Sequence, residues 1–249
     1  MSDEKKTGIL DHLRELRKRL LWSVVTVVVA SFVCFFFDNY ILDILKAPAG
    51  DIDLQFIELT EGFTSSMRIS ITAGIIISMP VIIYHFLMFV IPALTRQERK
   101  AVYIILPVVT IMFAGGVLFG YFYLVPPAIR FLLGWGEHLG VMENIRISDY
   151  INVATRLLLA IGILFELPVL TTFLARMGII TSQWLASRRR IMIIFSFVLA
   201  AIITPTFDAV NQSIVAGTMI VLYEISIWLA WLVQKRRQPA DIEADSGQE

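Results

Sequence analysis

The sequence predicts an all-α, polytopic membrane protein with six transmembrane helices, and three observations support this fold class. Of the 249 residues, 57% are hydrophobic, and the mean hydropathy is +0.75. A soluble chain of this length has too small an interior to bury that much apolar surface. The apolar residues also form long blocks. Lys and Arg are concentrated at the two termini and in every second loop between the blocks. A block of about 20 apolar residues crosses the hydrocarbon core of a bilayer as one helix.

Five blocks are long enough to cross, and a sixth is shorter. The expected crossings are residues 20–37, 69–91, 101–125, 157–175, 191–203 and 214–233. The fifth of these has thirteen residues, about 20 Å of helix. Taken alone, it could be a re-entrant segment.

The distribution of basic residues favours six crossings. With six, sixteen of the 21 Lys and Arg residues lie at the two termini and in the loops after the second and fourth crossings. This positive-inside pattern places both termini in the cytoplasm, whereas five crossings would put residues 235–237 (Lys-Arg-Arg) outside. We expect residues 1–233 to form a single integral-membrane domain, and the acidic segment 234–249 to be a disordered cytoplasmic tail.

Glu166 lies in the middle of the fourth block, two residues before Pro168. A carboxylate there costs about 2.5 kcal/mol or more unless it is protonated or paired. Arg156 or His85 could neutralise it, although Arg156 is about 15 Å away along the same helix. Together with Pro80 and Pro107, Pro168 predicts bent helices that form a curved, concave wall.

Two acids on the cytoplasmic side stand among bases. Residues 9–20 have apolar residues at helical spacing, which predicts an amphipathic helix on the inner surface with Glu15 among four cations. Glu98 stands among three cations in the first internal loop. Each acid could simply form a local ion pair, Glu15 with Arg19 or Glu98 with a neighbouring Arg, or it could bind a cationic ligand.

Other polar residues in or near the blocks have simpler explanations. Glu224 lies in the last block, and near the cytoplasmic surface it would be an ordinary surface acid. His85 fits a hydrogen-bonded packing residue, and its neighbours form no metal-binding pattern. Asp208 and Gln212 could cap the last helix or take part in a site. The single cysteine, Cys34, excludes an intrachain disulfide.

Several short motifs occur in order along about residues 9–233. They are His12-Leu-Arg-Glu-Leu-Arg-Lys-Arg-Leu20, Ala47-Pro48, Phe89-Val-Ile-Pro-Ala-Leu94, Glu98-Arg99, Phe165-Glu-Leu-Pro168 and Thr204-Pro205. With these motifs the chain resembles the TatC family, the C subunits of the twin-arginine protein translocase. It departs from the family in the loop 204–208 and at 215–217, where members often carry proline early in the last helix.

The resemblance implies a receptor subunit in the cell inner membrane that binds the Arg-Arg signal peptides of folded precursors. It also implies assembly with TatA- and TatB-type single-span proteins and with further copies of itself, and export driven by the protonmotive force. It implies no enzyme activity, no catalytic residues, no cofactor, no metal and no nucleic-acid partner. The resemblance further implies that the chain is embedded in the lipid bilayer and contacts its lipids.

The resemblance also implies roles for individual residues. Glu15 and Glu98 would bind the signal arginines, because carboxylates are bidentate partners of guanidinium groups. Glu166 would be the intramembrane polar site where a partner helix docks. The residues expected to support the cytoplasmic face are Arg17, Arg19, Phe89, Pro92 and Leu94. Those expected to serve a structural role or form the periplasmic cap are Pro48, Asp208 and Gln212.

Two other functional classes remain as alternatives. A six-helix secondary transporter could use Glu166 as a proton or ion site, but the sequence shows no internal repeat. An intramembrane hydrolase is less well supported, because no Gly-x-Ser-x-Gly motif is present. A Gly-x-x-x-x-Gly-Lys phosphate loop is also absent, so the sequence gives no sign of nucleotide use.

Overall fold

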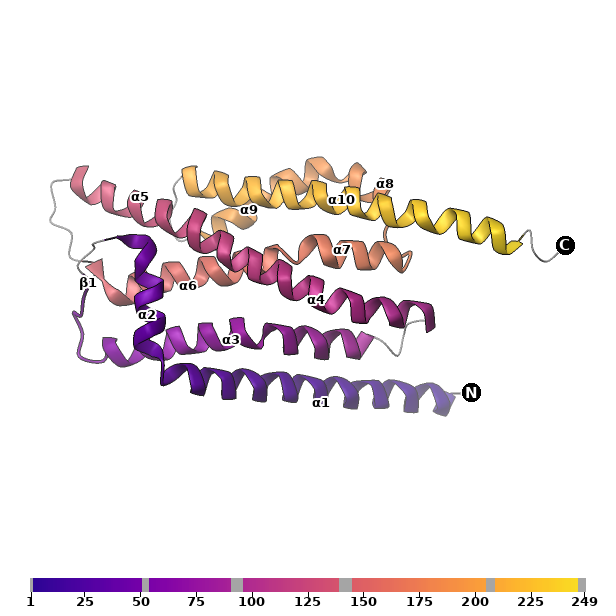
Figure 1. The fold of residues 1–249 in the computed structure, drawn as a ribbon, viewed down its shortest axis with the longest axis horizontal. Helices are drawn as coiled ribbons and strands as arrows, with labels where there is room; N and C mark the ends of the chain where they lie inside the picture. Colours follow the sequence, from indigo (N-terminus) through magenta and orange to yellow (C-terminus); the bar gives the residue numbers. More distant parts are fainter. Residues whose placement is uncertain (1, 51–53, 91–95, 139–144, 205–208, 246–249) are drawn as a thin grey trace. The chain divides into compact units, whose positions relative to one another are not determined.

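The computed structural model describes residues 2–50, 54–90, 96–138, 145–204 and 209–245, and these are almost entirely helical (Figure 1). The chain divides into two compact units. One unit comprises Met1–Ile111 with Asn144–Thr155, and the other comprises Met112–Glu143 with Arg156–Glu249. The helices α4 (Arg96–Phe119) and α6 (Ile147–Leu164) each contribute residues to both units.

In the first unit, the long helices α1 (Ser2–Phe35) and α3 (Glu61–Val90) lie side by side and antiparallel (Figure 1). They approach closely where Gly74 of α3 faces Ser31 of α1. A Cβ atom at Gly74 would lie only 2.6 Å from the backbone nitrogen of Ser31. Further along, the Ser78 hydroxyl donates a hydrogen bond to the Thr26 carbonyl oxygen at 3.3 Å. Small residues therefore set the spacing of this helix pair, as is common in membrane proteins.

The segment between α1 and α3 is ordered by contacts with the start of α6. It contains α2 (Asp38–Lys46), the 3₁₀ helix η1 (Ala47–Ala49) and the short strand β1 (Leu54–Gln55). Strand β1 pairs in parallel with β2 (Ile145–Arg146), with Leu54 opposite Ile145. The buried Tyr150 hydroxyl of α6 donates to the Leu45 carbonyl oxygen of α2. These two small strands are the exception to the predicted all-α class.

The second unit is built around α10 (Ala209–Asp245), which packs against α7 (Leu167–Arg176) and α9 (Arg189–Ile203). Its core contains the fully buried side chains of Ile161, Val215 and Met219. Thr181 caps the N-terminus of the helix α8 (Ser182–Ser187), because its side chain accepts a hydrogen bond from the Trp184 backbone nitrogen. In the same unit, the π-helix η3 (Gly120–Leu124) joins α4 to α5 (Val125–His138).

Five segments among the described residues are long and apolar enough to cross a membrane. They are Leu13–Phe35, Glu61–Phe89, Ile105–Phe131, Ile147–Arg176 and Ala209–Lys235. Each overlaps one of the predicted crossings and extends beyond it at one end or both. The predicted crossing 191–203 corresponds to α9, whose 15 residues make it shorter than these segments. Six crossings, cytoplasmic termini and a concave wall therefore stay predictions.

One of the two end helices differs from the sequence-based expectation. The segment 9–20 and the apolar segment after it belong to one continuous helix, α1, as their direct succession in the sequence suggests. Neither Gly nor Pro interrupts the chain between Leu13 and Phe35, so nothing in the sequence stops the helix there. At the other end, α10 continues as helix to Asp245, whereas we predicted a disordered tail from residue 234.

The three prolines within the apolar blocks act differently. Helices α3 and α4 continue through Pro80 and Pro107. The fourth block instead divides into α6 and α7, with Phe165 and Glu166 between them and Pro168 in the first turn of α7. Proline suits a first turn because its missing N–H has no partner there in any case.

Candidate functional site

Glu15 lies on the half-exposed side of α1 and is already paired. Arg19, one turn later, donates to Glu15 Oε1 from Nε at 3.0 Å and also from Nη2. The structure therefore contains the local ion pair that the spacing i, i+4 permits. A third of the Glu15 side chain remains exposed, so the carboxylate is still within reach of a ligand. Pairing with Arg19 and binding a ligand are compatible if one cation can replace another.

Arg17, expected to support the cytoplasmic face, is exposed on α1. It lines an open pocket together with Arg14 and Lys18, so its neighbours there are other cations. A cation in this setting cannot attract the arginines of a ligand. The structure thus separates Arg17 from the Glu15–Arg19 pair, although the three residues occupy the same stretch of one helix.

The second predicted acid, Glu98, belongs to the first turn of α4, at the third position of that helix. Its side chain lies outside the described residues, as do Pro92 and Leu94. Phe89, in the last turn of α3, is partly buried. The expected pairing of Glu15 with Glu98 across one face therefore stays a prediction.

Glu166 occupies the break between α6 and α7. Its Oε1 atom is buried and has no hydrogen-bond partner among the described residues. Within the same unit, Gly116 of α4 closely approaches the neighbouring Phe165, where a Cβ atom would lie 2.8 Å from that side chain. The alternative of an ion pair with Arg156, about 15 Å away along one helix, is not seen among the described residues of this unit. A buried carboxylate oxygen without a donor is energetically costly.

Three residues were expected to have a structural role or to form the external cap. Gln212 of α10 donates from Nε2 to the Phe197 carbonyl oxygen of α9 at 3.2 Å, so it links two helices of the second unit. Pro48 lies in η1, directly after α2, and is partly buried. Asp208 lies outside the described residues.

Two polar residues of the apolar blocks remain, and one of them, Glu224, has a partner within its own unit. Glu224 of α10 forms an ion pair with Arg189 of α9 at 2.8 Å, and both side chains are about half exposed. This agrees with its interpretation as a surface acid. His85, expected to be hydrogen-bonded, instead has a buried Nδ1 without a partner within the described chain. Its ring packs edge-on against Tyr84.

Sequence reasoning missed Glu61, which organises the segment before α3. Its side chain is only 2% exposed and lies at the first position of α3. Oε2 accepts hydrogen bonds from the backbone nitrogens of Ile57 at 2.8 Å and Glu58 at 3.2 Å, and Oε1 accepts from that of Ser148 at 3.1 Å. One carboxylate thus accepts hydrogen bonds from three backbone donors, two just before it in the sequence and one at the start of α6. In the sequence it was simply one acid of an acidic external stretch.

Arg146 balances the charge of this acidic segment. Its Nη2 donates to Glu58 Oε1 at 2.7 Å, and its Nε lies 3.7 Å from Glu61 Oε1. The hydrogen bond to Glu58 raises the pKa of the Arg146 guanidinium, which therefore remains charged. No group of three or more His, Cys, Asp or Glu that could hold a metal ion occurs in the described ranges.

Known proteins resemble this chain both in sequence and in structure. A sequence model of the family described as "Sec-independent protein translocase protein (TatC)" matches residues 11–217. The chain belongs to the TatC family. It is 35% identical over 253 residues to TatC of Koribacter versatilis, covering 98% of this chain and 93% of that protein. It is 38% identical over 240 residues to TatC of Campylobacter jejuni, covering 94% and 97%.

A solved structure of a TatC protein, described as the twin arginine translocase receptor, has the same fold. The two structures superpose with a TM-score of 0.79 at 38% identity, covering 90% of this chain and 99% of the other. The resemblance drawn from the motifs is therefore confirmed. This TatC-family chain is a multi-pass membrane protein of protein transport.

Proposed function

We propose that this TatC-family protein is the receptor subunit of the twin-arginine translocase in the cell inner membrane. It binds the Arg-Arg signal peptides of folded precursors through carboxylates at its cytoplasmic face. The position of Glu15 carries this proposal. Glu15 is a partly exposed acid at the charged end of a membrane-spanning helix, and it already holds a guanidinium group.

The chemistry of this proposal is exchange between arginines. Arg19 pairs with Glu15 in the free protein, and a signal arginine takes its place on binding. Because the signal arginine makes the contacts that Arg19 gives up, the carboxylate stays paired and the exchange costs little. Glu98 takes the second arginine, and two bidentate carboxylate contacts give selectivity for guanidinium over ammonium groups.

The proposed topology has six crossings with both termini in the cytoplasm. The positive-inside distribution supports it, because α9 must cross if residues 235–237 are to remain on the same side as the N-terminus. A crossing of 15 residues is short, so the bilayer is expected to thin around α9.

Partner assembly is the second part of the proposal. The unsatisfied Oε1 of Glu166 supports a polar contact with the helix of a TatA-type partner, while a TatB-type partner and further copies of the chain complete the complex. Energy comes from the protonmotive force. Membership of a family of protein translocase proteins makes the alternative of a secondary transporter the weaker one.

Site-specific crosslinking of a precursor with an Arg-Arg signal tests the proposal. We expect Glu15→Lys and Glu98→Lys each to abolish the crosslink, because reversed charge repels the signal arginines. The matched control is Glu58→Lys, a reversal in the external segment, which should leave the crosslink intact. Membrane insertion of each variant is checked in parallel. Normal crosslinking by both Glu15→Lys and Glu98→Lys would overturn the assignment.

A further inference from the structure

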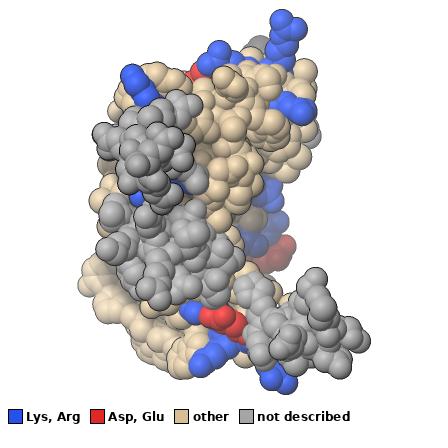
Figure 2. All heavy atoms as spheres, turned by 90° about the vertical axis from the view of Figure 1, so that its right-hand side faces the viewer, with Lys and Arg blue, Asp and Glu red and all other residues tan. Residues whose placement is uncertain are grey.

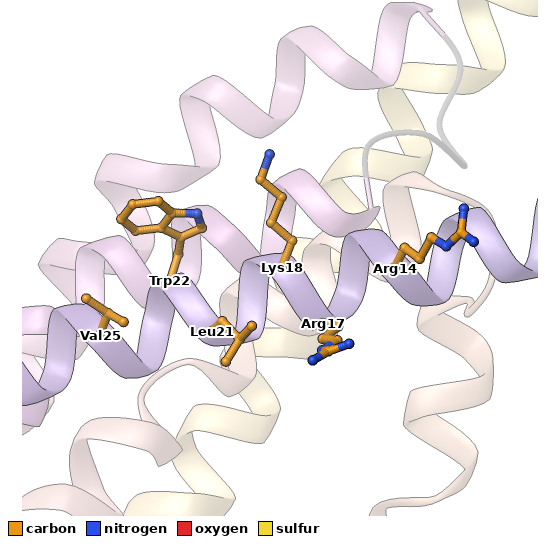
Figure 3. Close-up of a pocket in the computed structure, with 6 residues that line it drawn as sticks. All are labelled: Arg14, Arg17, Lys18, Leu21, Trp22 and Val25. Atoms are coloured by element: carbon orange, nitrogen blue, oxygen red, sulfur yellow. The ribbon is translucent and has the colours of Figure 1, made fainter.

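An open pocket runs along one face of α1, and three cations line one end of it. Its described lining is Arg14, Arg17, Lys18, Leu21, Trp22 and Val25. These positions follow the spacing of one helix face, so they form a continuous strip. Figure 3 shows them in order along α1, with Arg14 at one end and Val25 at the other.

The strip changes character along its length. Its first turn carries the cationic side chains, and its next two turns carry Leu21, Trp22 and Val25, which are apolar and exposed. The change occurs inside the membrane-spanning segment Leu13–Phe35. The charged end therefore lies where headgroups meet the hydrocarbon, and Trp22 lies at the depth typical of interfacial tryptophan.

Glu15 is the acid of α1 whose side chain the structure describes, and it pairs with neither Arg17 nor Lys18. Glu15 lies on the neighbouring face, where it is paired with Arg19. Neither Arg17 nor Lys18 forms an ion pair with an acid among the described residues. Figure 2, which views the molecule from the right-hand side of Figure 1, shows Lys and Arg side chains exposed on this side.

We propose that this strip is a binding site for a single anionic phospholipid. The headgroup phosphate is held by Arg17 and Lys18 with Arg14 beside them, and one acyl chain lies along Leu21, Trp22 and Val25. The order of charge and apolar surface along the strip matches the order of headgroup and chain in a lipid. A signal peptide arginine does not fit this end, because three cations would repel it. A soluble phosphate would leave the apolar half of the strip unused.

This site goes beyond the proposed receptor function and does not depend on it. It requires that α1 cross the bilayer, but not that Glu15 or Glu98 bind a signal. It gives the exposed Arg17 a ligand of opposite charge. It also leaves the Glu15–Arg19 face of the same helix open for the precursor.

Native mass spectrometry of the purified full-length protein tests the proposal, with phosphatidylglycerol titrated in a neutral detergent. We expect one retained lipid, and we expect Arg17→Gln/Lys18→Gln to weaken its retention by at least about tenfold, because each base near a headgroup favours anionic lipid. The matched control is Arg188→Gln/Arg190→Gln, which removes the same charge from exposed residues at the start of α9. This control should retain the lipid as the parent protein does.

Two further arms identify the ligand. Trp22→Ala should weaken retention of phosphatidylglycerol, while phosphatidylcholine should be retained equally by all variants. Glycerol phosphate, which has the headgroup chemistry without acyl chains, should compete only poorly. Equal losses in both double variants would show diffuse surface attraction and overturn the proposal. So would full competition by glycerol phosphate, or displacement of the lipid by an Arg-Arg peptide that then crosslinks to Trp22.

Discussion

Arg19 holds Glu15 through two donor atoms, Nε and Nη2, one turn apart on α1. The carboxylate proposed to receive a signal arginine is thus occupied by an arginine of the chain itself. This arrangement holds the Glu15 carboxylate against the surface of α1 in the free protein. It also makes Arg19 an internal competitor of the ligand.

Removing this competitor should strengthen signal binding. We expect Arg19→Gln to tighten binding of an Arg-Arg signal peptide by about two- to fivefold, because Glu15 then has no partly buried internal ion pair to give up. Fluorescence anisotropy with a labelled peptide measures the change. Arg188→Gln, which removes a cation at the start of α9, serves as the control and should leave the affinity unchanged. Weaker binding by Arg19→Gln would mean that Arg19 positions Glu15 instead of competing for it.

Glu61 should be the most important acid for the stability of the external segment. Glu61→Gln replaces one acceptor oxygen by an amide that cannot accept from a backbone nitrogen, so at least one of the donors Ile57, Glu58 or Ser148 loses its partner. We expect the Tm in detergent to fall by about 5 °C or more. Thermal unfolding followed by circular dichroism measures it.

Glu58→Gln is the matched control for this prediction. Glu58 carries the same charge three residues earlier, but its side chain is 65% exposed and contacts only the Arg146 side chain through its carboxylate within the described segments. The control should lower the Tm by less than half as much, because an exposed ion pair contributes little. Equal effects of the two substitutions would show that the buried hydrogen bonds of Glu61 do not hold the segment.

The helical fold could be predicted because its signals are local. Apolar blocks of spanning length and alternating basic loops need no knowledge of contacts, and each of the five long segments overlaps a predicted crossing. A bend beside Glu166 could also be predicted from Pro168, and the helix does divide there, whereas α3 and α4 continue through Pro80 and Pro107. The short α9 could not be assigned with the same certainty, because crossing depends on its neighbours and on the bilayer.

The contacts that hold polar groups could not be predicted. Glu61 and Ser148 are 87 residues apart, and nothing in either local sequence indicates that a carboxylate will meet that backbone nitrogen. The parallel pairing of β1 with β2 likewise joins two segments that are far apart in the sequence. For Glu15, the sequence is compatible both with an ion pair to Arg19, four residues later, and with binding of a cationic ligand. The structure shows the local pair.

Because α1 and α3 approach closely at Gly74, a larger residue at this position should lower the stability of the protein. Gly74→Ala would place Cβ 2.2 Å from Ser31 Oγ and 2.6 Å from the Ser31 backbone nitrogen, so the two helices must separate. We expect a loss of about 1–3 kcal/mol of stability, typical of overpacking. Denaturation in mixed micelles measures it.

Gly115→Ala provides the matched control. It makes the same substitution inside a membrane helix, but its Cβ would meet nothing within 4 Å. Because alanine is the better helix former, this variant should be as stable as the parent protein or more so. A larger loss at Gly115 than at Gly74 would contradict the packing inferred for α1 and α3.

Glu166 should matter for partner assembly and not for signal recognition. It lies in the break between α6 and α7 with an unsatisfied Oε1, far in sequence from the charged end of α1. We expect Glu166→Ala to leave crosslinking of the Arg-Arg signal unchanged and to reduce copurification of a TatA-type partner several-fold. Glu166→Gln, which keeps a polar side chain of the same shape, should restore part of the recruitment if a hydrogen bond to the partner is what Glu166 supplies. Normal recruitment and export by Glu166→Ala would instead show that the buried carboxylate only shapes the break between the two helices.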